Sequence, residues 1–294
     1  MTGVEALYAH LGTGATTVCW AWAVVRRDGV MFGFTDHDCD LSFDGMVFKA
    51  SSGLSASALL QTTGLAIDNS EAVGALSDAS VTEADIMAGR FDGAEVQAWQ
   101  VNWADPGARV LQFRGTFGQL TRSSGQFHAE LRGLTEALNQ PQGMIYQTSC
   151  SAILGDAGCG FDLTRAGYFA ELAVEQVWDA RVFQFGDLTG FDDRWFERGR
   201  LVVVSGAAAG LVGVVKNDRL SDPGRMVELW QPLGAEIVVG DRIRLEAGCD
   251  KLAATCQMKF HNFLNFRGFP DIPGADWLMS YPTRAGVNDG GSLT

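Results

Sequence analysis

The chain is short of basic residues. Its 294 residues include 22 Lys and Arg against 35 Asp and Glu, which gives a formal charge of −13 at pH 7. A groove that follows nucleic-acid phosphates needs a positive surface, so the composition argues against sequence-independent binding of DNA or RNA. The charge excess bears on solubility and on the choice of partner, and it leaves the fold open.

Long apolar runs are also missing. A membrane-spanning helix needs about 20 mostly apolar residues, whereas the most apolar stretch, 201–215, is interrupted by Gly206 and Gly210. This stretch favours two buried strands around a turn. The first Lys or Arg is Arg26, so the basic start of a secretory signal peptide is absent. We therefore expect a protein that is made in the cytoplasm and does not insert into a membrane by itself.

The common catalytic motifs are absent: we find no G-x-S-x-G, Walker loop, H-E-x-x-H or dinucleotide fingerprint. One acidic run with a histidine could bind a divalent ion, because carboxylates and imidazole are metal ligands. The more ordinary interpretation is a polar turn whose Asx side chains bond to the backbone. The sequence therefore predicts no enzyme, and the alternative is a metal-dependent hydrolase acting on cell wall through Asp36, His37, Asp38 and Asp40.

What the chain does contain is a succession of short strand-like runs separated by turns. Asp28-Gly29 and Asp44-Gly45 each stand between apolar-rich runs, a pattern typical of β-hairpins with a type I′ turn. Helical signals are few and short, around 82–89, 134–138 and 252–264. Hydrophobic residues make up 47% of the chain, enough for a buried core. The fold class predicted is mainly β, with a few short helices.

The six cysteines are too sparse for a disulfide scaffold. Cys19 and Cys39 stand alone in the N-terminal hairpins, where we expect small buried hydrophobes. The other four form two distant pairs, and two pairs in an unsecreted chain suit a four-thiolate metal or cluster site. Buried free thiols and disulfides remain open from the spacing. The four are Cys150 and Cys159, spaced C-x8-C, and Cys249 and Cys256, spaced C-x6-C.

Helix geometry constrains the second pair. If Cys249 and Cys256 were both helical, they would share a face but lie about 10 Å apart. To reach one centre, Cys249 must therefore lie on a loop that folds back over the start of the helix. Asp250 is placed to cap that helix, and Gly155, Gly158 and Gly160 would let the backbone wrap closely around a bulky group.

Several blocks of sequence resemble the baseplate hub proteins of tailed phages and gene transfer agents, in order and over almost the whole chain. The opening blocks are Gly33-Phe-Thr-Asp-His-Asp38, Leu41-Ser-Phe-Asp-Gly45, Val101-Asn-Trp103, Phe113-Arg-Gly-Thr-Phe-Gly118 and Leu138-Asn-Gln-Pro141. The later blocks are Cys150-x-Ala152-x-Leu154-Gly-Asp-x-x-Cys159, Ala247-Gly-Cys-Asp250, Thr255-Cys-x-x-Lys-Phe-x-Asn262, Asn265-Phe-Arg-Gly-Phe-Pro270 and Ile272-Pro-Gly274.

The resemblance implies a structural hub in the tail baseplate of a virion, assembled in the bacterial cytoplasm. It implies a homotrimer of β-barrel-like or sandwich-like domains around a channel for DNA in transit. The expected partners are the distal tail protein, a large tip or fibre (megatron-like) protein and a cell-wall peptidase. The related tail-tip protein of lambda-like phages holds a 4Fe-4S cluster with four cysteines, and by this similarity Cys150, Cys159, Cys249 and Cys256 would be its ligands here. Zinc in the same site is the alternative cofactor.

The expected domain organisation follows from these observations. Residues 1–140 would form an N-terminal β-rich hub domain. Residues 141–160 together with 247–294 would form a small cysteine-rich domain that binds the cluster. Residues 161–246 would form a β-barrel-like domain inserted between its two halves, which the cluster would clamp together and stabilise.

Overall fold

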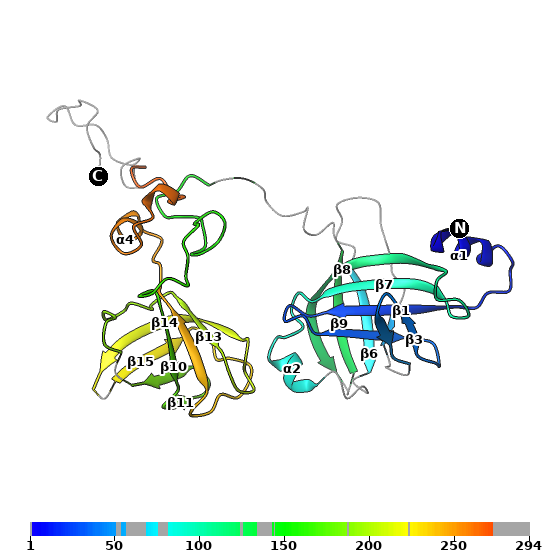
Figure 1. Cartoon of the computed structure of the whole chain (residues 1–294), viewed down its shortest axis with the longest axis horizontal. Helices are drawn as coiled ribbons and strands as arrows, with labels where there is room; N and C mark the ends of the chain where they lie inside the picture. The colour runs from blue at the N-terminus through cyan, green and yellow to red at the C-terminus, as the bar shows by residue number, and fades with distance from the viewer. Residues whose placement is uncertain are drawn as a thin grey trace. The chain divides into compact units, whose positions relative to one another are not determined.

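The first half of the chain is built around one antiparallel sheet. The structure, a computed structural model, describes residues 2–50, 54–56, 69–75, 82–123, 126–133, 143, 145–186, 188–222 and 224–272. The chain divides into two compact units, Met1–Gln142 and Gly143–Thr294 (Figure 1). Each unit carries a seven-stranded sheet, so the predicted mainly β fold class is confirmed. The three-domain division stays a prediction.

The sheet of the first unit runs in the order β2-β1-β7-β8-β9-β6-β5, and its strand pairs are all antiparallel. A two-stranded hairpin, β3-β4, accompanies it. The elements of this unit are α1 (Gly3–Leu11), β1 (Val18–Val25), β2 (Met31–Thr35), β3 (Leu41–Phe43), β4 (Met46–Phe48), β5 (Leu54–Ala56), β6 (Asn69–Ala75), α2 (Glu83–Met87), β7 (Glu95–Asn102), β8 (Arg109–Ser123) and β9 (Gln126–Gly133).

Strand β1, which lies between β2 and β7, is covered on both faces. Successive side chains of a strand point to opposite faces, so Trp22 and Val24 enter one core, with Phe113. Ala21 and Ala23 enter another, which Leu41, Phe43 and Phe48 of the β3-β4 hairpin complete. Cys19 lies in this second core, 7% exposed, as expected for a small buried hydrophobe. Cys39 is exposed, so its predicted burial is wrong, because it lies on the polar turn before β3.

The two predicted Asp-Gly turns differ. Asp44 and Gly45 both have positive φ, 51° and 75°, as a type I′ hairpin requires. In the other turn Gly29 alone is left-handed (φ 85°), and the turn closes with hydrogen bonds from Gly29 N to Arg26 O and from Arg26 N to Val30 O. The turn at Asp28-Gly29 is therefore longer by one residue than predicted. The helix predicted over 134–138 lies outside the described residues.

The second unit contains a closed β-barrel with strand order β10-β16-β13-β14-β15-β12-β11. The two end strands of this order are joined by only two residues, Val174 and Glu175. Val174 N donates to Asp241 O, and Glu175 N donates to Gln184 O, so one bent strand closes the barrel. Its strands are β10 (Phe169–Ala173), β11 (Gln176–Trp178), β12 (Val182–Phe185), β13 (Arg200–Val203), β14 (Val212–Ser221), β15 (Gly224–Leu229) and β16 (Arg242–Glu246).

The apolar residues Ile237–Val239 do not form a strand, because the Asp241 carboxylate accepts the Val238 N–H that a strand ladder would use. One local prediction in this unit is wrong. The helix expected over 252–264 is broken into α4 (Ala253–Met258) and the 3₁₀ turn η1 (Phe263–Asn265), with His261 left-handed (φ 50°) between them. No helix of the described residues is long and apolar enough to cross a membrane.

A small module without strands extends from one end of the barrel (Figure 1). We call it the cysteine module: residues 145–168, which precede β10, and residues 247–272, which follow β16. Its two segments are adjacent because β10 and β16 pair directly, with Phe169 opposite Glu246. The barrel thus brings together chain segments that are about 90 residues apart in sequence.

Candidate functional site

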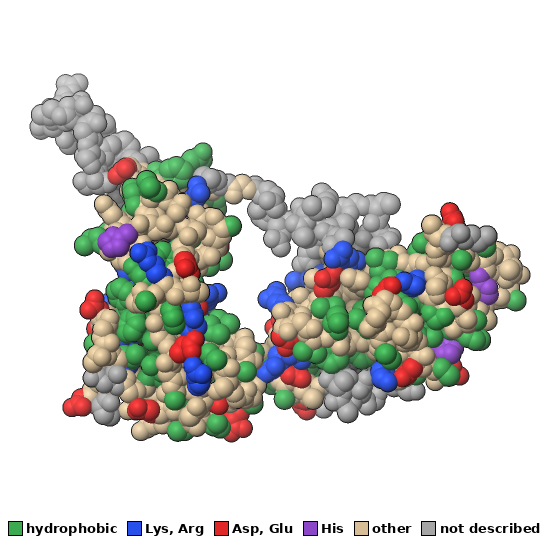
Figure 2. Space-filling model, viewed as in Figure 1, with side chains coloured by type: hydrophobic (Ala, Val, Ile, Leu, Met, Phe, Trp, Pro, Cys, Tyr) green, Lys and Arg blue, Asp and Glu red, His purple; other side chains and the backbone are tan. Residues whose placement is uncertain are grey.

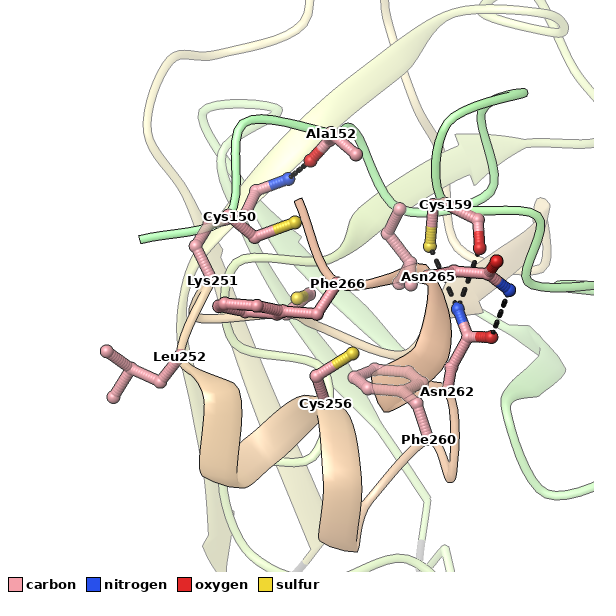
Figure 3. A pocket seen from close by; sticks show the side chains of 12 residues that line it. Cys150, Ala152, Cys159, Lys251, Leu252, Cys256, Phe260, Asn262, Asn265 and Phe266 are labelled. Carbon is pink, nitrogen blue, oxygen red and sulfur yellow. Dashed lines mark hydrogen bonds between the residues drawn. The ribbon is translucent and has the colours of Figure 1, made fainter. Parts of the chain in front are cut away.

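All four predicted cysteines line one pocket of the cysteine module (Figure 3). Cys150 and Cys159 come from the loop before β10, Cys249 follows β16, and Cys256 lies on α4. Cys249 is on the loop before the helix, as the geometry of the pair predicted. The remaining lining residues are Ala152, Leu154, Lys251, Leu252, Phe260, Asn262, Asn265 and Phe266.

The loop that carries Cys249 is held by local hydrogen bonds. Lys251 is left-handed (φ 68°), and its N–H donates to the Cys249 thiol. The Asp250 carboxylate accepts from Leu252 N (2.9 Å) and from the Thr255 hydroxyl (2.8 Å). Leu252 is the N-cap of α4 and makes no side-chain cap bond, so Asp250 orders the approach to the helix rather than capping it as predicted.

The Cys159 loop is ordered by one carboxylate. Asp156 accepts hydrogen bonds from Cys159 N (2.6 Å) and Ile153 N (2.7 Å), and these N–H donors lower the pKa of Asp156. Gly155 and Gly160 adopt positive φ on either side of it, 85° and 62°. A β-carbon is strained in that region of φ, so two of the three glycines singled out in the sequence serve the sharp turns of this loop.

The two halves of the module are joined beside the sulfurs. Cys150 N donates to Lys251 O (2.9 Å), while Arg267 N donates to the Cys150 Sγ (3.4 Å). Ser151 donates to Arg267 O through both its N–H and its hydroxyl, each at 3.0 Å. The thiols therefore lie where the two distant segments meet.

Electrostatics in the pocket disfavour free thiolates. The pKa of Cys256 is raised to about 11, first by burial and then by the neighbouring thiols of Cys249, Cys150 and Cys159. Burial likewise raises the pKa of Cys249. Thiols with raised pKa values, such as Cys249 and Cys256, are stabilised as thiolates when a cation replaces their protons.

The spacing of the sulfurs bears on which cation fits. In a tetrahedral zinc site with Zn–S distances of about 2.3 Å, the sulfurs are roughly 3.8 Å apart. All four cysteines belong to the described residues, and no three of their sulfurs lie within 4.8 Å of one another. In a cluster each thiolate binds a different iron, so its ligands are spread more widely. Without a bound metal, the sulfurs are therefore spaced more widely than one zinc ion requires.

Below the thiols, the module packs on the barrel through a small aromatic core. Phe161, Tyr168 and Phe260 contact one another with centroid distances of 4.7–5.7 Å. Lys259 reaches from the end of α4 to two backbone carbonyls, Trp195 O at 2.6 Å and Gly248 O at 2.9 Å. Burial lowers the pKa of Lys259 to about 8, so this cation is part of the packing rather than a solvated charge.

The acidic-histidine run forms a turn in the first unit. Asp36 accepts from Trp20 N at 2.7 Å, and Asp40 accepts from Ala50 N and from the Lys49 ammonium, both at 2.8 Å. Their carboxylates are thus used by the turn. The ligand atoms of His37, Asp38 and Cys39 lie within 4.8 Å of one another.

One of the ligand atoms in this group already accepts a hydrogen bond. His37 Nδ1 accepts from Cys39 N (2.9 Å), and the His37 ring packs on Trp103 with centroids 5.0 Å apart. The observed geometry is that of the polar turn with side-chain-to-backbone bonds. The four residues of the alternative hydrolase do not converge on one centre in the described part of the chain.

Some site residues had no role assigned from sequence. Asn262, Lys259 and Arg267 all contact the thiols or their supporting backbone, and each lies in or beside the C-terminal blocks of the resemblance. Asn, Lys and Arg are residue types that are common at protein surfaces. Their place in these blocks was the available signal, and it does not say which side chains turn inward.

The chain matches two family models. Residues 4–162 match "Baseplate hub protein, N-terminal attachment domain", and residues 194–276 match "Phage conserved hypothetical protein BR0599". Among curated proteins, none matches. Among solved structures, a chain from "Virion of native gene transfer agent (GTA) particle" is 59% identical, with 99% of this chain and 100% of that chain covered and a TM-score of 0.91.

Proposed function

Because the chain belongs to the baseplate hub proteins of virion tails, we propose that it acts as a structural hub joining the distal tail proteins to the tip or fibre protein. The similarity to a chain of a gene transfer agent virion over nearly the whole length carries this proposal. Its test is to delete the gene from a strain that produces particles and to image the tails. Tails that end without a baseplate are expected, and complete baseplates would overturn the proposal.

The assembly we propose is a homotrimer around the channel through which DNA leaves the particle. Native mass measurement of the purified chain is expected to give three times the 31.6 kDa of one chain, and with the distal tail partner the complex is expected to contain three copies of this chain. A single copy of this chain in both samples would argue against the trimer.

We further infer that the channel lining is acidic, so that it repels phosphate and DNA slides without binding. The net charge of −13 supports this. Figure 2 shows Lys and Arg side chains interspersed with Asp and Glu over the visible faces of both units, rather than a field of one sign. A trimer structure with a basic channel lining would overturn this inference.

In the cysteine module, we propose that Cys150, Cys159, Cys249 and Cys256 hold a structural 4Fe-4S cluster. The convergence of the four sulfurs, the raised pKa values of Cys249 and Cys256 and the wide spacing of the sulfurs support it. When bound, the cluster supplies iron–thiolate bonds between the loop before β10 and the segment after β16, and such bonds contribute folding free energy.

Anaerobic purification with a visible spectrum and quantitation of iron, sulfide and zinc tests this proposal. A broad visible band with iron and sulfide, abolished by Cys150→Ser, is the expected result. A colourless protein with one zinc ion would mean that zinc, and not a cluster, joins the two segments of the module. Cys19→Ser is the matched control, because Cys19 lies in the core of the first unit.

We propose no enzymatic activity for the chain. The hydrogen bonds that the Asp36 and Asp40 carboxylates accept from backbone N–H groups support this. His37→Ala in purified protein provides the test on peptidoglycan: any hydrolysis that is measured should be unchanged. A loss of hydrolysis would revive the metal-dependent hydrolase.

A further inference from the structure

One residue contacts both cysteine pairs, through its backbone on one side and its side chain on the other. Asn262 follows α4, and its backbone N–H donates to Cys256 O at 3.0 Å. Its side-chain Nδ2 points to the other pair, toward Cys159 O (2.7 Å) and Cys159 Sγ (3.5 Å) (Figure 3). Asn262 thus links a ligand of the second pair to a ligand of the first.

The orientation of this amide is set by a neighbour. Asn265 lies one turn further along the chain, and its Nδ2 donates to Asn262 Oδ1 at 2.8 Å. With its oxygen engaged, the Asn262 amide presents N–H rather than C=O to Cys159. Both asparagines line the pocket, so the pair belongs to the wall around the sulfurs.

The other donors to these sulfurs are of a different kind. Cys150 Sγ receives Arg267 N, and Cys249 receives Lys251 N, and both are backbone groups that follow from the path of the chain. For the four cysteines of the module, Asn262 is the one side chain that donates to a sulfur among the hydrogen bonds of the described residues. It is therefore the donor that a substitution can remove without rebuilding the loop.

A hydrogen bond to a thiolate favours its ionised, metal-binding form and draws electron density from the sulfur. Partners of this kind typically change metal affinity or activity by 10–100-fold when they are removed. We propose that Asn262 is a positioning residue of the metal centre, an inference that rests on the proposed centre itself. Asn262 holds Cys159 toward Cys256 and stabilises the bound thiolate of Cys159.

Asn262→Asp tests this, because it keeps the shape and replaces the N–H donor with an oxygen that repels both Cys159 O and Cys159 Sγ. In the anaerobically purified full chain, metal loss to a chelator is expected to be 10–100-fold faster than in the wild type. With iron in the site, the reduction potential is expected to become more negative, a change that a purely structural role would not produce.

The control makes the same chemical change nearby. Gln257→Glu lies on the exposed side of α4, next to Cys256 in sequence, and should leave both the rate and the potential at wild-type values. Should Asn262→Asp fail to fold, Asn262→Ala removes the donor without adding charge and should shift both readouts in the same direction.

The outcomes separate the two proposals. A wild type that holds metal, with Asn262→Asp and Asn262→Ala matching it in rate and potential, overturns the role of Asn262 and leaves the metal centre standing. A wild type that binds neither iron nor zinc overturns the metal centre and this role together. Faster loss in the Asn262 variants but not in Gln257→Glu supports both.

Discussion

The barrel and the cysteine module belong to the same compact unit, yet they are held together in different ways. Fourteen buried apolar residues form the core of the barrel, whereas three, Phe161, Ala247 and Phe260, form that of the module. Burial of apolar surface is the main favourable term in folding. The barrel therefore has a core of the usual kind, and the module has very little of one.

The module replaces a core with directed bonds. Its loops are ordered by carboxylates that accept N–H groups, as at Asp156 and Asp250, and by Lys259 on two carbonyls. A net hydrogen bond contributes only about 1 kcal/mol. We expect the four converging thiols to stabilise the module in place of a large core when they bind the proposed metal centre.

The largest expected effect follows from removing that centre. Treatment with a chelator under reducing conditions should abolish hydrogen-exchange protection at Cys150, Cys256 and Asn262, whose N–H groups are bonded within the module. Barrel amides such as Val203 should keep theirs. Structural four-ligand metal sites contribute on the order of 10 kcal/mol of apparent binding free energy. Protection that persists in the module would show that its loops are stable unaided.

The barrel is expected to be destabilised by a substitution in its interior. Asp218 and Arg225 form an ion pair with both side chains fully buried, and Asp218 also accepts Phe196 N at 2.7 Å. Asp218→Ala leaves the guanidinium buried without its partner, so we expect a loss of about 3–5 kcal/mol in the free energy of unfolding. Urea denaturation measures it, and Glu171→Gln, which breaks the exposed pair with Arg242, should cost below about 1 kcal/mol.

The contact between the barrel and the cysteine module provides the next test. Lys259→Met removes the donor to Trp195 O and Gly248 O. Trp195 O keeps its bond from Gly248 N, so the loss falls mainly on Gly248 O and should lower the stability of the module by about 1–3 kcal/mol. Thermal unfolding followed by hydrogen exchange will show whether the loss is confined to the module. Lys216→Met on the barrel, whose ammonium pairs with Glu228, is the control, and an equal loss there would refute a specific role for Lys259.

The smallest effect concerns the loop of the barrel that faces α4. Glu197 pairs with Arg194 (2.7 Å) and Arg219 (3.1 Å), and the Arg194 guanidinium is the main cause that lowers the pKa of Glu197 to about 2 from 4.5. A carboxyl with a lowered pKa adds stability above about pH 4.5 and loses it as the pH falls toward 2. Because the arginines are exposed, we expect under about 1 kcal/mol.

Glu197→Gln should therefore flatten the dependence of stability on pH between 4.5 and 2, while stability near neutral pH changes little. Urea midpoints at several pH values in this window provide the measurement. A variant with the wild-type slope would assign the acid sensitivity to other carboxyls.

Much of the fold could be predicted from local patterns. The Asp44-Gly45 hairpin formed as expected because both residues tolerate positive φ. Thr82 caps α2 by accepting Asp85 N. The helix α1 was missed although its signal was present, since Thr2 and Glu5 form a capping box. The apolar spacing over 252–264 indicated one helix, but it could not show that His261 would turn left-handed and end it.

The sequence by itself determined the mainly β class, the family and the identity of the four cysteines, because hydrophobic alternation, turn residues and cysteine spacing are local properties of the chain. Only the tertiary structure decided that the pairing of β10 with β16 brings the two cysteine pairs to one pocket. It alone also turned Asn262 toward Cys159. Contacts between segments about 100 residues apart depend on the register of the barrel, and no local pattern encodes that register.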